Sequence, residues 1–445
     1  MIWPTKVKWQ ELERSTKISF IVVILLYTGM AMIGWFKPGA SWKDAQVFAW
    51  ASSHYELGLD VTRGFNLSAE GIESGVQMGD CEVYVMAPPL YHLFLSGVYA
   101  VGNQSWQVLR IGPFVYGLIY LYASLALAAK YLKGQARSWL LLFTLSPMIL
   151  IFSAWNDQLA ITLGFAVLAY LCVTNYLETA ETKWLAWAGV IYLLGFWNSY
   201  IILSILPSVF VHLLLHPGLT WRQRISGISV FFGFVLAGAL VSAAHIAQLP
   251  DSLQWFVDRI AYRFSNREAD TSGGGSISLA SFFIREAGRY VTHFSPISIL
   301  LSLAALGEVI LRWVRERGQA ARQPQGLQTV GTGALLLVFL SWGLPSQAGI
   351  QVAYIHPIMM YYSTVFLAFG SVLGLQWLAD KIKQPGTRTL VVRLTVLAFL
   401  VFSLTRSVFN LTGGSLSAIV TGVPEKPAKT FGLDELRQYT CRDGR

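Results

Sequence analysis

The sequence predicts an all-α polytopic membrane protein with about eleven transmembrane helices and two or three interfacial helices in long outer loops. Hydrophobic residues make up 54% of the chain and charged residues only 13%, where a soluble domain carries about 25% charge. The apolar residues also lie in long runs, and residues 18–36, for example, contain no charge. A run of about twenty apolar residues is long enough to cross the hydrocarbon core of a bilayer.

Eleven apolar segments of roughly bilayer length are the expected spans. They lie near residues 18–36, 111–131, 138–154, 158–177, 184–199, 201–216, 226–247, 295–313, 329–344, 356–378 and 389–406. The first segment is not followed by a small-residue cleavage site, so we interpret it as a retained span and not as a signal peptide. We expect the whole chain, residues 1–445, to form one membrane domain.

The placement of Lys and Arg predicts the orientation in the membrane, because cytoplasmic connections are typically rich in these residues. With the N-terminus inside, the inner connections all hold Lys or Arg, whereas the short outer connections at 155–157 and 345–355 hold none. We therefore expect a cytoplasmic N-terminus and an outer C-terminus in a plasma (inner) membrane. The compact outer loops favour a bacterial membrane.

Several function classes are not favoured. The net charge of +9 would suggest nucleic acid in a soluble protein, but topology explains these cations, so we expect no nucleic-acid partner. The sequence has no Walker A motif, Rossmann glycine pattern or zinc-ligand spacing, which argues against an ATP-driven pump or an ordinary nucleotide-sugar enzyme. Cys81 and Cys441 both fall in expected outer segments, and the sequence leaves their pairing open.

Three expected outer segments carry almost all the polar sequence, and the first two form the candidate active surface. These segments are residues 37–110, 248–294 and 407–445, and surface helices are expected within them at 41–57, 89–100 and 276–291. Asp44 lies in the first of these helices. One interpretation is a capping box, with Ser41 as N-cap and Asp44 three residues later. The other is a catalytic carboxylate.

The order of motifs along the chain favours the catalytic interpretation. After Asp44 come the segment YVMAPPLY from Tyr84 to Tyr91, then WQVLR ending at Arg110, then Ser146-Pro147, and finally Asn156-Asp157. This order resembles the C-type superfamily of membrane glycosyltransferases. It is most similar to the branch that holds protein O-mannosyltransferases and lipid A aminoarabinose transferases.

The resemblance implies transfer of a sugar, with inversion, from a polyprenyl-phosphate donor to a hydroxyl of a glycan, lipid or protein outside the cytoplasm. Asp44 would match the base that activates the acceptor hydroxyl. Asp157 would be a second active-site acid, although a helix N-terminus also favours an acid there. Tyr84, Tyr91 and His356 would contact substrate.

The sequence departs from the family pattern at two positions. Ala45 stands where the second acid of an Asp-Glu pair is usual, which leaves a divalent metal ion open, and Ala87 stands where the aminoarabinose branch has a Lys. Other cations must then hold the donor phosphate. The candidates are Arg110, Arg285, Arg289 and His293, the last three spaced by four residues and so on one helix face. The alternative for the arginines at 285 and 289 is an interfacial helix on which they meet lipid headgroups or Glu286, and the alternative for Arg110 is a side chain that extends to the membrane interface.

Two rival functions remain. A transporter or lipid flippase would carry ionisable residues near mid-span, whereas this sequence concentrates its polar residues outside the spans. A glycosyltransferase-like scaffold that binds lipid without turnover is the other rival, and Ala45 and Ala87 motivate it.

Overall fold

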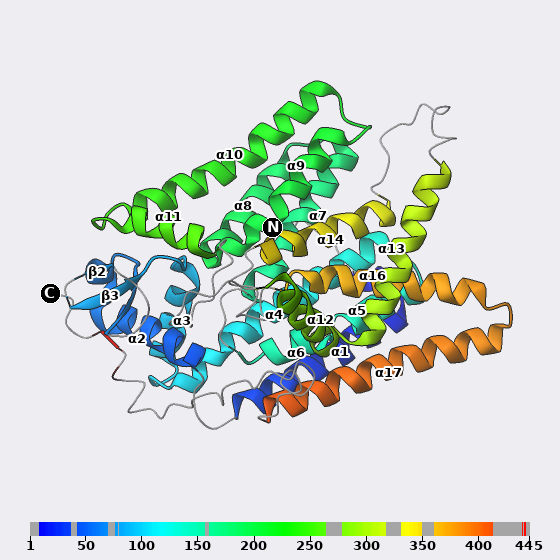
Figure 1. Ribbon diagram of the computed structural model, residues 1–445, viewed down its shortest axis with the longest axis horizontal. Helices are drawn as coiled ribbons and strands as arrows, with labels where there is room; N and C mark the ends of the chain where they lie inside the picture. The colour runs from blue at the N-terminus through cyan, green and yellow to red at the C-terminus, as the bar shows by residue number, and fades with distance from the viewer. Residues whose placement is uncertain are drawn as a thin grey trace.

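The computed structural model describes residues 9–36, 42–69, 76–78, 80–155, 160–263, 278–316, 331–348, 360–412, 438 and 440–441. The fold is that of a helical, polytopic membrane protein (Figure 1). Among the described residues, six helices are long and apolar enough to cross a membrane. They are α1 (Arg14–Trp35), α4 (Ile111–Tyr131) with the 3-10 turn η2 (Trp106–Arg110) before it, α10 (Trp221–Ile246), α13 (Pro296–Glu316), α16 (Ser363–Lys381) and α17 (Pro385–Leu411).

Shorter helices occupy the other expected spans, so the number eleven stays a prediction. They are α5 (Gln135–Phe143), α6 (Pro147–Phe152), α7 (Leu163–Thr179), α8 (Lys183–Asn198), α9 (Leu206–Leu215) after the 3-10 turn η4 (Tyr200–Ile205), and α14 (Thr332–Ala348). The expected span at 138–154 is divided into α5 and α6. The break lies before Pro147, because proline disfavours the helical conformation in the residue before it and has no N–H to donate.

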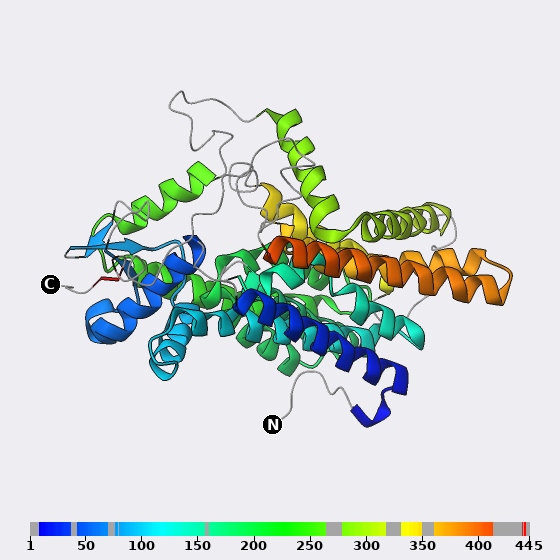
Figure 2. The ribbon, with the colours of Figure 1, turned by 90° about the horizontal axis from the view of Figure 1, so that it is seen from below.

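A small sheet, which the sequence did not lead us to expect, lies at one end of the molecule. Strands β1 (Asn66–Ser68), β2 (Gln77–Met78) and β3 (Cys81–Tyr84) pair antiparallel in the order β1-β3-β2. The surface helices α2 (Trp42–Thr62) and α3 (Leu90–Val101) lie beside it (Figures 1 and 2). We call this end of the molecule the sheet end.

Two further helices belong to the second long segment. Helix α11 (Ser252–Arg263) follows α10, and its Trp255 and Phe256 pack against the apolar core of the sheet. Helix α12 (Leu279–Phe294) packs against α6 and α13. It occupies most of the range 276–291 in which the sequence predicts a surface helix.

A disulfide between Cys81 and Cys441 ties the C-terminal segment to β3, with the two Cα atoms 5.9 Å apart. The Cys441 N–H donates to Ser53 Oγ at 3.0 Å, and the hydroxyls of Ser52 and Thr440 are 2.9 Å apart. The chain's last described residues are thereby fastened to α2 as well as to the sheet. The structure thus settles a pairing that the sequence had left open.

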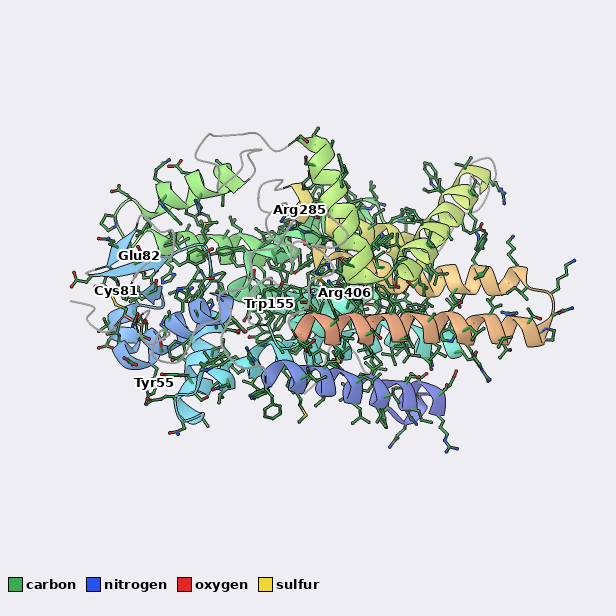
Figure 3. All side chains as sticks on the ribbon, turned by 60° about the horizontal axis from the view of Figure 1, so that its bottom comes forward. Tyr55, Cys81, Glu82, Trp155, Arg285 and Arg406 are labelled. Atoms are coloured by element: carbon green, nitrogen blue, oxygen red, sulfur yellow. A yellow bond between two sulfur atoms is a disulfide. The ribbon has the colours of Figure 1, made fainter. Side chains whose placement is uncertain are left out.

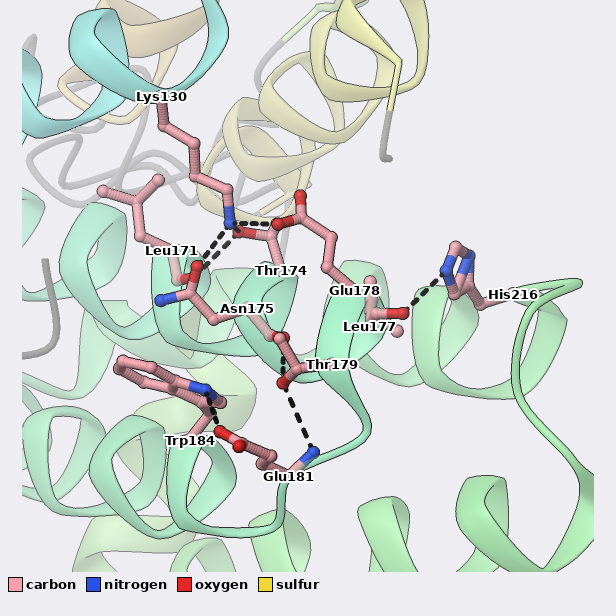
Figure 4. A network of polar contacts seen from close by, with 10 residues as sticks. All are labelled: Lys130, Leu171, Thr174, Asn175, Leu177, Glu178, Thr179, Glu181, Trp184 and His216. Carbon is pink, nitrogen blue, oxygen red and sulfur yellow. Dashed lines mark hydrogen bonds and ion pairs between the residues drawn. The ribbon is translucent and has the colours of Figure 1, made fainter. Parts of the chain in front are cut away.

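The spanning helices pack closely where small residues allow it. A side chain at Gly374 of α16 would overlap the backbone of Leu301 in α13, so glycine is required for this approach. At the end opposite the sheet, Lys130 of α4 contacts Glu178 of α7 at 3.1 Å and donates to Thr174 Oγ1 at 3.0 Å (Figure 4). This network joins two helices at the end where the Lys- and Arg-rich connections lie.

Candidate active site at the sheet end

Asp44 and Arg110 form a buried ion pair at the sheet end. The Arg110 Nη2 donates to Asp44 Oδ2 at 3.2 Å, and both side chains are 4% exposed. Asp44 lies in the first turn of α2, where the positive end of the helix dipole stabilises a carboxylate. Arg110 ends η2 and precedes α4. The pair therefore joins the start of α2 to the start of a spanning helix.

Arg110 also fastens the end of α1. Its Nη1 donates to the carbonyl of Gly34 and, at 3.1 Å, to that of Trp35. Carbonyls in the last turn of a helix lack intrahelical partners, and an arginine near them is favourable. The guanidinium carbon lies 4.6 Å from the ring centroid of Trp106, which adds a cation–π contact. Arg110 thus has a defined position inside the protein, which differs from the alternative of a side chain extended to the membrane interface.

The capping-box interpretation of Asp44 stays a prediction. Ser41 lies outside the described residues, whereas the Asp44 carboxylate contacts Arg110. Removing one partner of a buried ion pair typically costs about 3–5 kcal/mol, because the other charge is left uncompensated.

Aromatic residues of α2, β3 and α3 pack together at the sheet end. Trp50 of α2 stacks on Tyr84 with ring centroids 4.9 Å apart, and His92 meets Trp50 edge-on at 4.6 Å. Tyr91 is fully buried and packs so closely against α4 that a side chain at Gly112 would overlap it. Of the two tyrosines expected to contact substrate, Tyr84 is half-buried and Tyr91 lies in the core between α3 and α4.

A second charged cluster lies on one face of α12. Arg289 donates to Glu286 Oε1 at 2.7 Å, and both side chains are buried. His293 is buried too, and its Nδ1 lies 3.0 Å from the Arg289 carbonyl. Arg285 is half-buried, at the edge of this face. The spacing of four places Arg289 and His293 on one face and leaves Arg285 more accessible. The contact of Arg289 with Glu286 is one that the sequence offered as the alternative to phosphate binding.

Contacts through α1, α6 and α17 connect the two clusters. A side chain at Gly34, whose carbonyl Arg110 binds, would overlap Ala154, which follows α6, and would also touch Leu411 of α17. Helix α6 packs against both α12 and α17. On α17, the Arg406 Nε donates to the carbonyl of Thr292 in α12 at 3.3 Å. The ends of α1, α6, α12 and α17 therefore meet in one region of the molecule.

Several expected site residues cannot be placed, and one residue of the region was missed. Asp157 and His356 lie outside the described residues. Arg406, which is 3% exposed, is absent from the sequence-based candidates. The sequence signal for Arg406 is a lone arginine near the outer end of the last apolar segment. Composition alone identifies that segment only as a span.

Metal binding is not supported by a ligand cluster in the part of the chain that the structure describes. Within it, no group of three or more His, Cys, Asp or Glu side chains could hold an ion.

Burial raises the pKa of Tyr290 on α12 to about 12, so its hydroxyl stays protonated near its partner Ser363 Oγ, 2.8 Å away. The described part of this region is therefore built from fixed cations, carboxylates and hydroxyls.

Comparison with solved structures identifies a similar fold. ArnT from Cupriavidus metallidurans, in its structure bound to undecaprenyl phosphate, matches with a TM-score of 0.53 and 12% identity, covering 89% of this chain and 76% of that chain. Its apo structure matches with a TM-score of 0.51 and 12% identity, over 90% and 77% of the two chains. No protein-family model and no curated protein matches the sequence. The chain therefore shares the fold of ArnT, in agreement with the resemblance that the order of motifs indicates.

Proposed function

We propose that this chain, which has the fold of a C-type membrane glycosyltransferase, transfers a sugar from a polyprenyl-phosphate donor to an acceptor hydroxyl. The observation that carries the proposal is the buried ion pair of Asp44 and Arg110, 3.2 Å apart, where α1, α2 and α4 meet. ArnT, a protein of similar fold, has been solved bound to undecaprenyl phosphate. The same class of lipid is the donor carrier proposed here.

In this reaction Asp44 is the general base. It accepts the proton of the acceptor hydroxyl as the oxygen forms a bond to the anomeric carbon of the sugar. The bond from that carbon to the phosphate oxygen breaks in the same step, so the configuration inverts. Arg110 holds the Asp44 carboxylate through Oδ2 and thereby orients it. A single displacement of this kind needs one base only.

The leaving group is a lipid phosphate, which gains negative charge as the bond breaks. Fixed cations that face this charge stabilise it without reorganisation. We propose that Arg289 and His293 on α12 do so, with Arg285 at the accessible edge of the same face. Asp157 and His356 complete the proposal as acceptor-side and substrate-binding residues. The sugar and the acceptor are left unassigned.

A lipid-binding scaffold without turnover is the second candidate function. Two buried alanines, at positions where the family pattern has charged residues, favour it. Ala45 and Ala87 are 1% and 5% exposed, Ala45 packed with the core of α2 and α3 and Ala87 beside Trp50. Neither buried alanine supplies the charged side chain of the family pattern. This candidate predicts binding of a polyprenyl phosphate with no sugar transfer.

Mass spectrometry of lipid that copurifies with the protein tests the proposal. We expect a polyprenyl phosphate that carries a sugar. Incubation with acceptor-containing membrane extract should then release free polyprenyl phosphate. A bound polyprenyl phosphate that never loses its sugar would select the scaffold, and a protein without any polyprenyl lipid, even after titration, would contradict both candidates.

A further inference from the structure

Arg406 is a buried cation. The part of its helix that points towards the sheet end is otherwise apolar. It lies in α17, which is long and apolar enough to span a membrane, and it is 3% exposed. Figure 3 shows it in the middle of the molecule, on the ribbon of α17. A charged side chain inside an apolar span is costly, so its retention points to a role.

The role is indicated by the atom that Arg406 contacts. Its Nε donates to the carbonyl oxygen of Thr292, in the last turn of α12, at 3.3 Å. The last carbonyls of a helix lack intrahelical partners, and the negative end of the helix dipole lies there. Arg406 therefore caps α12 from a neighbouring span and fixes where α12 ends.

The turn that Arg406 holds carries His293 and follows the turn that carries Arg289. His293 follows Thr292, and its ring nitrogen lies 3.0 Å from the carbonyl of Arg289. The Thr292 hydroxyl also donates back to the Gly288 carbonyl at 3.0 Å. On the same helix, the Tyr290 hydroxyl lies 2.8 Å from Ser363 Oγ of α16. Two spans thus hold α12 in place, α16 through a hydroxyl pair and α17 through a charge.

We propose that Arg406 is a positioning residue for the donor phosphate, acting through α12. It keeps the last turn of α12 in the orientation at which Arg289 and His293 receive the phosphate. This inference rests on the proposed function, because it assumes that α12 binds the donor. A cation held in place before the ligand arrives binds more tightly than one that must be ordered on binding.

A double-mutant cycle tests whether Arg406 acts through α12. Undecaprenyl phosphate is titrated into the full-length protein in detergent, as wild type, Arg406→Gln, Arg289→Gln and the double variant. We expect Arg406→Gln to weaken binding about tenfold in the wild-type background, within the range of one charge-assisted hydrogen bond. In the Arg289→Gln background the same substitution should weaken binding less than about twofold, because the group it positions has been removed.

Other outcomes overturn the inference in distinguishable ways. Equal losses in both backgrounds would mean that Arg406 acts independently of Arg289, and no loss in either would mean that it has no role in donor binding. If wild type itself does not bind the lipid, the proposed function fails and takes the inference with it.

Two further variants separate positioning from general stability. Arg393 is an exposed arginine on the same helix, and Arg393→Gln should leave lipid affinity unchanged. Arg406→Lys retains a cation but not the planar guanidinium, so it should fold and weaken binding by about threefold, again only when Arg289 is present. If Arg406→Gln does not fold, Arg406→Lys replaces it in the double-mutant cycle. A loss that is equal with and without Arg289 would overturn the inference here too.

Discussion

At the scale of single residues, Asp44 combines burial with a fixed partner. Its carboxylate lies in the first turn of α2 and contacts Arg110 through one oxygen. Because Arg110 also binds the carbonyls that end α1, a displacement of α1 would move the carboxylate as well. The position of this one side chain is therefore set by three helices.

Replacing Asp44 by Asn retains its shape and removes the proton acceptor. We expect Asp44→Asn to lower the rate of sugar transfer at least about a hundredfold, the low end for general-base catalysis. Transfer is measured with the copurified donor and membrane extract as acceptor, and the Tm is measured in parallel. Asp60→Asn is the matched control, because Asp60 is an exposed acid on the same helix. A folded Asp44→Asn protein that transfers sugar normally would refute the assignment.

His54 predicts a pH dependence of stability at the sheet end. Its Nδ1 lies 3.1 Å from Thr62 Oγ1, and burial lowers its pKa to about 4, with the Asn66 hydrogen bond opposing the shift. The folded pKa lies below the unfolded value of about 6.5, so the unfolded state binds a proton first as the pH falls. Stability is therefore complete above about pH 6.5 and declines towards pH 4, by on the order of 3 kcal/mol for the full shift.

This effect can be measured by thermal unfolding of wild type and His54→Gln from about pH 7.5 to about pH 4.5, which covers most of that pH window. The Tm of wild type should fall more steeply with decreasing pH than that of His54→Gln. Parallel curves would show that other groups cause the acid sensitivity.

At the scale of secondary-structure elements, α12 has two chemically different faces. Leu279, Phe283 and Ile284 are 60%, 64% and 68% exposed, whereas Glu286 and Arg289 are buried on the opposite face. Helices of this kind lie in the membrane interface with their apolar face against lipid. We propose this arrangement for α12, which would place its charged face against the other helices and next to a donor phosphate.

The buried face of α12 should determine donor affinity. We expect Arg289→Gln to weaken binding of undecaprenyl phosphate about ten- to a hundredfold, since a charged hydrogen bond contributes roughly 1.5–3 kcal/mol. Arg285→Gln should have a smaller effect, because Arg285 lies at the half-buried edge. Arg315→Gln, at an exposed position in the last turn of α13, is the control. Equal effects of all three substitutions would place the phosphate elsewhere, with Arg110 the next residue to test.

At the scale of the whole molecule, the two ends differ in chemistry. The sheet end carries the disulfide and the ion pair of Asp44, and the cation-bearing helix α12 lies nearer the middle of the molecule (Figure 1). The opposite end carries the connection between α16 and α17 with Lys381 and Lys383 (Figure 1). Disulfides persist in oxidising compartments, and Lys-rich connections are typical of the cytoplasmic side. Both features support the proposal that the sheet end faces outwards.

Labelling of introduced cysteines tests this orientation in intact cells. In a Cys172→Ser background, Ser272→Cys should react with a membrane-impermeant thiol reagent and Lys133→Cys should not. Cys81 and Cys441 should react only after reduction, because they are paired. External labelling at position 133 would place the candidate site in the cytoplasm and contradict the proposed donor geometry.

Much of the fold was predictable because a bilayer imposes a local rule on sequence. Every span must be a run of apolar residues of sufficient length, so the segments could be located one at a time. The division of the 138–154 segment is also a local effect, at Pro147, but the length of the run concealed it. The three-stranded sheet escaped prediction, since its strands are two to four residues long and show no extended alternation.

The sequence alone determined the membrane fold class, the expected orientation and the candidate residues Asp44, Arg110, Arg289 and His293, because each depends on local composition, spacing or motif order. Only the tertiary structure decided which of them meet. Asp44 pairs with Arg110 across 66 residues, Arg406 reaches Thr292 across 114, and Cys81 bonds Cys441 across 360. Such contacts depend on how helices pack side by side, and no local pattern in a chain specifies which helix ends adjoin.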